Sequence, residues 1–146
     1  MKILLVISIV IICTLLIYMF LIMPRVFGKP DKKPFFVQKL YAHRGLFDNN
    51  SEAPENSMAA FEKAVAAGYG IELDVQLTKD KIPVVFHDDT LKRVCKAEGF
   101  VYNYTLEELQ QFFLYNSEQK IPKFADVLEM VDGRVPLIVE YKINGL

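Results

Sequence analysis

The sequence predicts an α/β protein: the N-terminal half of a TIM-type (β/α)8 barrel, preceded by one transmembrane helix. Three observations lead to this fold class. The first 22 residues are almost wholly apolar, short apolar runs then alternate with helical patterns, and polar residues follow each apolar run where it ends. Because a closed barrel needs about 250 residues, we expect residues 37–146 to supply about four strands, or half a barrel.

Residues 3–22 form the predicted membrane span, since they contain no charge, proline or glycine. A helix of about 20 residues is about 30 Å long, which matches a bilayer core. A cleaved signal peptide is the alternative, but its apolar region is about 7–15 residues long and ends at a small-x-small site. Here the run continues to Met23-Pro24-Arg25. We therefore expect residues 1–22 to be an uncleaved, single-pass anchor in the cell membrane.

Residues 23–36 are rich in proline, glycine and basic residues, and this composition predicts a basic linker. Its basic residues outnumber Lys2 on the other side of the span, so the positive-inside rule favours a cytoplasmic position for residues 37–146. These basic residues are Arg25, Lys29, Lys32 and Lys33. The whole chain has 17 basic and 18 acidic residues. No basic stripe is visible, so we expect no nucleic-acid partner.

Strands and helices alternate in residues 37–146. Apolar runs predict strands at 39–43, 70–77, 83–87 and 136–140. Helical spacing and end signals predict helices at 57–67, after Thr105 in a capping box with Glu108, and from about Phe124 to Gly133. This β-then-α order favours parallel strands. The aromatic residues Phe112, Phe113 and Tyr115 follow helical spacing and are expected to provide core or cap packing.

The candidate catalytic residues follow the predicted strands. In a barrel the carboxyl ends of parallel strands share one rim, where active sites lie. Glu72 and Asp74 are two residues apart on a strand, so both side chains face the same way. Two such carboxylates repel each other unless a proton or a cation lies between them. Oxygen ligands suit Mg²⁺ or Ca²⁺; ordinary exposed acids are the alternative.

The fourth predicted strand repeats this spacing with Glu140 and Lys142, which could add a third metal ligand and a cation for a phosphate. The chain has two histidines, His43 and His87, and each closes a predicted strand. On the same rim they indicate a general acid and a general base. Arg44 offers a forked donor suited to phosphate.

Five motifs in order resemble the glycerophosphodiester phosphodiesterase family over about residues 39–142. The motifs are His43-Arg44-Gly45, Pro54-Glu55-Asn56-Ser57, Glu72-Leu73-Asp74, Val84-Val85-Phe86-His87-Asp88 and Glu140-Tyr141-Lys142. The resemblance implies a barrel of the phospholipase-C-like phosphodiesterase type. It also implies metal-dependent cleavage of glycerophosphodiesters to glycerol 3-phosphate and an alcohol.

The same resemblance implies a role for each residue. The implied metal ligands are Glu72, Asp74 and Glu140, the implied acid/base pair is His43 and His87, and Arg44 and Lys142 would hold the phosphate; Glu55 is a possible contact to metal or substrate. Two departures from the family stand out. Lys81 replaces the usual glycine before the third strand, and four further strands would have to follow Leu146.

Two other functions stay open at this point. One is a lysophospholipase D-like enzyme that acts on membrane lipids, which a membrane anchor would favour. The other is a truncated, catalytically inactive, membrane-tethered interaction protein.

Overall fold

The computed structural model describes residues 2–22, 36 and 39–142, and the chain divides into two compact units, Met1–Lys33 and Pro34–Leu146. The first unit contains helix α1 (Lys2–Ile22). Its segment Leu5–Ile22 has a mean hydropathy of 3.1, with none of it buried, so it is long and apolar enough to cross a membrane. A signal sequence has the same properties. The predicted linker lies almost entirely outside the described residues.

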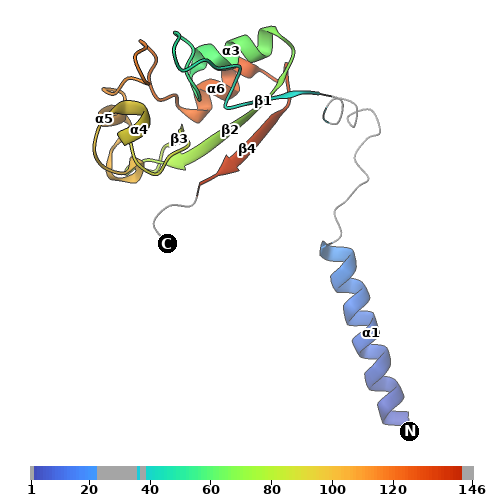
Figure 1. Ribbon diagram of the computed structural model, residues 1–146. Helices are drawn as coiled ribbons and strands as arrows, with labels where there is room; N and C mark the ends of the chain where they lie inside the picture. The colour runs from blue at the N-terminus through green and yellow to red at the C-terminus, as the bar shows by residue number, and fades with distance from the viewer. Residues whose placement is uncertain (1, 23–35, 37–38, 143–146) are drawn as a thin grey trace. The chain divides into compact units, whose positions relative to one another are not determined.

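The second unit is built on a four-stranded sheet of β1 (Tyr41–His43), β2 (Gly70–Leu77), β3 (Pro83–Val85) and β4 (Leu137–Tyr141) (Figure 1). β2 is parallel to both β1 and β4. Their carboxyl ends therefore lie at the same end of the sheet, as an α/β barrel wall requires.

β3 does not run parallel to the others: it pairs with the end of β2 in the antiparallel sense, and the prediction of a fourth parallel strand is wrong. Residues 78–82 make the connection, and a parallel crossover would need about a dozen residues or more. Ile71 pairs with both β1 and β4, whereas Val75 pairs with both β3 and β4. β3 thus extends the edge of β2 that β1 occupies, and β4 covers the opposite edge.

Lys81, in the turn before β3, has a φ of +64°. Non-glycine residues rarely adopt this left-handed backbone conformation. A lysine at this position therefore carries a local backbone cost that a glycine would avoid.

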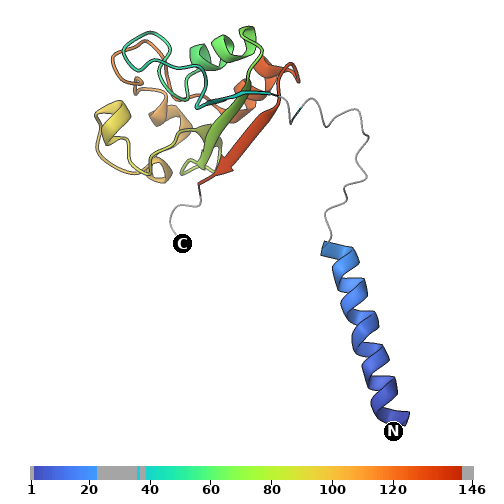
Figure 2. The same cartoon turned by 45° about the vertical axis from the view of Figure 1, so that its right-hand side comes forward.

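Two helices cover one face of the sheet: α3 (Met58–Ala66) and α6 (Phe124–Val131) lie on the same side of it in both views (Figures 1 and 2). Their apolar stripes meet the alternate side chains of β2 that point away from Glu72 and Asp74. The buried core there consists of Ala42, Phe61, Ala64, Ile71, Leu73, Val75, Val85, Val127, Val131 and Val135. Both predicted helices are thus present where the periodicity placed them.

A second core lies beside β3 and is built by three short helices, α4 (Lys92–Cys95), η2 (Val101–Asn103) and α5 (Leu106–Leu109). It contains Val84, Phe86, Leu91, Val94, Val101, Leu109, Leu114 and Ile121. The predicted capping box is confirmed, since Thr105 and Glu108 make both of its hydrogen bonds. The helix itself is only four residues long, so Phe112, Phe113 and Tyr115 follow it and are not helical. Neither α4 nor η2 was predicted from the sequence.

Candidate active site

Three carboxylates meet at the carboxyl end of β2. Glu72 and Asp74 share one face of β2, and Glu140 is the cross-strand partner of Asp74 on β4. One carboxylate oxygen from each residue lies within 4.8 Å of the other two. Asp74 is only 1% exposed, which makes an uncompensated charge there costly. The structure therefore brings together the three acids that the sequence singled out.

The surroundings of Asp74 fit a hard cation. Asn56 Nδ2 donates to Asp74 Oδ2 at 3.0 Å, and Arg44 Nε lies 3.6 Å from the same oxygen. Two buried side-chain atoms have no hydrogen-bond partner among the described residues, and they are Arg44 Nε and Asn56 Oδ1. Buried polar atoms are rarely left unpaired. An amide oxygen of this kind beside three carboxylates suits Mg²⁺ or Ca²⁺, or water bound to the ion.

Lys142 lies against two of these acids. Its Nζ is 3.2 Å from Asp74 Oδ1 and also bonds Glu140 Oε1. Burial acts to lower the pKa of Lys142, but the hydrogen bonds and charges of Glu140 and Asp74 outweigh it and raise the pKa. The ammonium group therefore stays charged at neutral pH and neutralises part of the acidic cluster.

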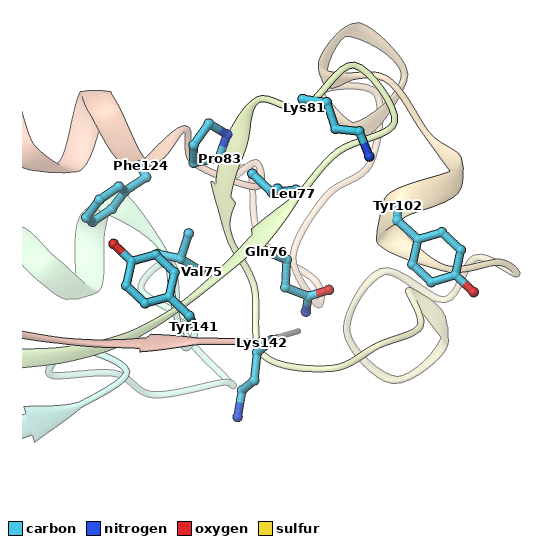
Figure 3. Close-up of a pocket in the computed structure, with 9 residues that line it drawn as sticks. All are labelled: Val75, Gln76, Leu77, Lys81, Pro83, Tyr102, Phe124, Tyr141 and Lys142. Carbon is cyan, nitrogen blue, oxygen red and sulfur yellow. The ribbon is translucent and has the colours of Figure 1, made fainter. Parts of the chain in front are cut away.

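A pocket of about 410 Å³ borders this end of the sheet (Figure 3). Lys142 and Gln76 point to one side of the strands, while Tyr141 and Phe124 point to the other. The rest of the lining is mostly apolar and comprises Val75, Leu77, Lys81, Pro83 and Tyr102. Among the lining residues, Lys142 is the one that also contacts Asp74 and Glu140 in the described part of the chain.

The end of β1 places His43 and Arg44 beside Glu72. His43 Nε2 is 3.9 Å from Glu72 Oε2, and the imidazole is 68% exposed. The Arg44 amide donates to the Glu72 carbonyl at 2.9 Å and to its carboxylate at 3.2 Å. Arg44 itself has a φ of +58°, and Gly45 follows with a φ of +84°. This tight turn holds the arginine against the carboxylates at a cost in backbone strain.

Glu55 is near the three carboxylates, but its own carboxylate binds two guanidinium groups. It is 5% exposed, and its Oε1 lies 3.3 Å from Arg44 Nη1 and 2.5 Å from Arg93 Nη2. Burial acts to raise the pKa of Glu55, yet hydrogen bonds and charge from Arg93, then Asn49 and Arg44, together lower it. Glu55 is therefore an ionised anchor for the arginines.

His87 follows β3, where the chain has reversed its direction. The Phe86 amide donates to the Asp74 carbonyl at 2.9 Å, which sets the segment after β3 beside the carboxylates. Gln76 Nε2 donates to the carbonyls of Phe86 and Asp88, at 2.9 and 2.7 Å, so the backbone on both sides of His87 is fixed. An antiparallel hairpin, and not a fourth parallel strand, therefore sets the backbone before His87 beside that of Asp74, and a shared role for His87 and the acids stays a prediction.

Four residues of this site received no role from the sequence: Asn56, Gln76, Arg93 and Tyr115. Gln76 follows Asp74 by two positions on β2, so the strand periodicity could have placed it on the polar face. Tyr115 was expected only to pack; it does contact the second core, and its hydroxyl also accepts hydrogen bonds from Arg93 and Asn49. No sequence signal marked Arg93, because α4 is a single turn.

Parallel strands with acidic, basic and imidazole groups at one rim define an α/β protein of the TIM-barrel class with a candidate active site at the carboxyl ends of its strands. Comparison with known families then narrows the class. The chain belongs to the glycerophosphoryl diester phosphodiesterase family, whose sequence model matches residues 43–145.

Individual relatives of the chain carry the name of the same family. The chain is 41% identical to a glycerophosphodiester phosphodiesterase of Bacillus altitudinis over 114 residues, which cover 73% of this chain and 45% of the relative. It is 43% identical to one of Caldanaerobacter subterraneus over 111 residues, covering 71% and 44%. The chain therefore spans less than half the length of these curated relatives.

Solved structures confirm the predicted fold class. A glycerophosphodiester phosphodiesterase from Agrobacterium tumefaciens matches with a TM-score of 0.64 at 31% identity, over 72% of this chain and 47% of that one. A phosphodiesterase from Oleispira antarctica, solved in complex with the product sn-glycerol-3-phosphate, matches with a TM-score of 0.63 at 33% identity, over 71% and 44%. These neighbours are TIM-barrel proteins that align with part of the chain.

Proposed function

We propose that the protein hydrolyses glycerophosphodiesters to glycerol 3-phosphate and an alcohol with the help of a divalent cation. The observation that carries the proposal is the approach of Glu72, Asp74 and Glu140 to within 4.8 Å at the carboxyl end of parallel strands. Membership of the family supports it, as does the product named for the Oleispira antarctica structure.

The proposed roles follow from charge and reach. Glu72, Asp74 and Glu140 would hold Mg²⁺ or Ca²⁺, which when bound polarises a phosphoryl oxygen. Arg44 and Lys142 lie against the same acids, so they are placed to neutralise the charge that grows on the phosphate oxygens.

The two imidazoles would move the protons. One of His43 and His87 accepts the proton of the attacking glycerol hydroxyl group, and the other donates a proton to the oxygen of the departing alcohol. Water then completes the hydrolysis to glycerol 3-phosphate. Glu55 contributes by holding Arg44. Direct contact of its second carboxylate oxygen with the metal or the substrate is the alternative role.

The decisive experiment measures glycerol 3-phosphate release from glycerophosphocholine by the intact protein, with and without added Mg²⁺ or Ca²⁺. We expect Glu72→Gln, Asp74→Asn and His43→Ala each to lower kcat/KM by at least about 100-fold. Glu98→Gln is the matched control, because Glu98 is 86% exposed and pairs only with exposed Lys92 among the described contacts. Full activity in the two carboxylate variants, or activity that ignores chelator, would contradict the proposal.

Helix α1 favours a membrane setting for this chemistry. We propose that residues 3–22 anchor the protein as a single-pass span, with the catalytic part on the cytoplasmic side as the basic residues of 23–36 favour. Resistance of the full chain to alkaline carbonate extraction, with an intact N-terminus in its mass spectrum, is the expected result. Release into the supernatant as a shortened chain would indicate a cleaved signal sequence.

The same helix supports a second substrate class. An anchored active site close to the bilayer could act as a lysophospholipase D-like enzyme on lysophospholipids. Parallel assays with lysophosphatidylcholine and glycerophosphocholine separate the two substrates. No turnover of either with any divalent cation would instead favour the tethered interaction protein.

A further inference from the structure

Arg93 joins the two loops that carry the proposed catalytic groups. Its Nε and Nη2 form a two-point contact with the Asp88 carboxylate, at 2.7 and 2.8 Å. Nη2 also reaches Glu55 Oε1 at 2.5 Å, and Nη1 donates to the Tyr115 hydroxyl. The guanidinium carbon lies 5.9 Å from the centre of the Tyr115 ring. A planar fork with this many partners leaves the side chain little freedom to move.

Asp88 passes this constraint on to His87. Its Oδ1 lies 2.7 Å from His87 Nδ1. An ionised carboxylate can only accept hydrogen bonds, so Nδ1 carries the proton and Nε2 is the nitrogen that can exchange one. The hydrogen bond from Arg93 is the main cause that lowers the pKa of Asp88 to about 2. Asp88 therefore stays an acceptor throughout the range in which an imidazole works as an acid or base.

We propose that Arg93 is a positioning residue for His87, acting through the Asp88 carboxylate. This inference rests on the proposed function, in which His87 transfers a proton. The arrangement resembles in logic the carboxylate that orients a catalytic histidine in hydrolytic triads, where tautomer and ring orientation decide the rate. Arg93 also forms an ion pair with Glu55, which in turn binds Arg44. Arg93 therefore connects the loop of His87 and Asp88 to the loop of Glu55.

Lys92, on the same helix as Arg93, makes an ordinary surface contact that serves for comparison. Lys92 Nζ lies 3.3 Å from Glu98 Oε1, and the two side chains are 74% and 86% exposed. The partners of Arg93 are instead 6% exposed for Glu55 and 20% for Asp88. Exposed pairs contribute little to stability or to order. Lys92→Ala is therefore the matched control for every measurement below.

The first test measures which ring nitrogen of His87 carries the proton, and it does not depend on enzymatic activity. The chain has two histidines, so a His43→Gln variant of the intact protein assigns the ¹⁵N signals of His87. We expect neutral His87 to be protonated at Nδ1 in the wild-type and Lys92→Ala backgrounds, and to become a mixture of tautomers in Arg93→Ala and Arg93→Lys. Arg93→Lys keeps the positive charge but removes the planar guanidinium group that makes the two-point contact, so it separates positioning from net charge. An unchanged His87 tautomer in both Arg93 variants would overturn the proposal.

The second test uses glycerol 3-phosphate release by the intact protein. We expect Arg93→Lys to lower kcat by about 10- to 100-fold with KM changed by less than about 3-fold, as for other residues that orient a catalytic group. In a His87→Ala background the same substitution should cost less than about 3-fold, because the group it orients is gone. Equal losses in both backgrounds would overturn the proposal. A wild-type protein without activity would refute the proposed function alone, and the imidazole measurement would still decide the role of Arg93.

Discussion

The ammonium nitrogen of Lys142 lies 3.2 Å from Oδ1 of Asp74 and also bonds Glu140. The positively charged side chain of Lys142 therefore contacts two of the three proposed metal ligands. The two residues meet because β4 runs parallel to β2 and pairs Glu140 with Asp74. A lysine two positions further on then points to the same side as Glu140. The charge of the acidic cluster is thereby reduced by a side chain that would also face the phosphate.

Replacing Lys142 with methionine should separate metal binding from turnover. We expect Mg²⁺ to bind about 10-fold more tightly, because the competing ammonium group is gone while the three carboxylates remain. The value of kcat/KM should nevertheless fall by about 100-fold, since a cation on the phosphate is lost. Calorimetric titration with Mg²⁺ and an assay of glycerol 3-phosphate release check the two effects.

Lys120→Met is the control for removing a lysine charge, because Lys120 lies over the Phe113 ring in the other half of the domain. It should alter neither quantity. Weaker Mg²⁺ binding in Lys142→Met would show that Lys142 does not compete with the ion.

The turn after β1 should tolerate no side chain at Gly45. A Cβ there would lie 2.9 Å from Ala60 Cβ and 3.0 Å from the Phe61 ring, and the φ of +84° adds backbone strain. We expect Gly45→Ala to lower the free energy of unfolding by about 3 kcal/mol, from about 1 kcal/mol of left-handed strain and about 2 kcal/mol of overpacking. Urea unfolding of the detergent-solubilised protein, followed by circular dichroism, measures the change.

Gly68 provides a matched control, because its φ is +74° and nothing lies within 4 Å of the Cβ position. Gly68→Ala should carry the strain alone and cost about 1 kcal/mol. An equal loss of unfolding free energy in Gly45→Ala and Gly68→Ala would mean that α3 moves away from the new methyl group without cost.

The parts of the site that follow one strand were predictable from the sequence. Glu72 and Asp74 share a face by strand alternation, and Glu140 and Lys142 repeat that spacing on β4, so their convergence needed only parallel pairing of β2 with β4. His43 was predictable for the same reason, since it pairs with Glu72 across β1 and β2.

The rest depends on tertiary packing that no local pattern encodes. The direction of β3 could have been predicted from its connection, since residues 78–82 are too few for a crossover. The position of Arg93 could not: α4 is one turn long, and its approach to Glu55 depends on how the second core packs. The left-handed backbone of Arg44 is likewise imposed by its surroundings, because arginine does not favour it, whereas Asn56 is of a residue type that adopts this conformation more readily.

Acidification should remove a contribution of Asp88 to stability. Its pKa is about 2 in the folded protein against an ordinary 3.8, chiefly because Arg93 bonds the carboxylate. A lowered folded-state pKa stabilises the protein above pH 3.8, and the contribution is lost as the pH falls from about 4 to 2. For a group that is 20% exposed the full effect is about 2 kcal/mol.

Asp88→Asn should accordingly lower the free energy of unfolding at pH 7 by about 2 kcal/mol, and the gap to the wild type should narrow below pH 4. Urea titrations at pH 7, 5, 4 and 3 measure both proteins. Asp48→Asn supplies a control on an exposed turn, where the Asp48 carboxylate accepts a hydrogen bond from the Asn50 amide and forms no ion pair among the described contacts. A gap that stays constant down to pH 3 would show that Asp88 is not held in its ionised form.

Cys95 should resist alkylation in the folded protein. Burial raises the pKa of its thiol from 9.0 to about 12, and the side chain packs against the second core. Because only the thiolate reacts, a shift of this size lowers the reactive fraction at pH 8 by about 100- to 1000-fold.

A Cys13→Ser variant leaves Cys95 as the one thiol, so mass spectrometry after iodoacetamide treatment reports on it alone. The same variant in 8 M urea should react at the ordinary rate of an exposed cysteine. Rapid labelling without denaturant would mean that the core built by α4 and α5 opens on the timescale of the reaction.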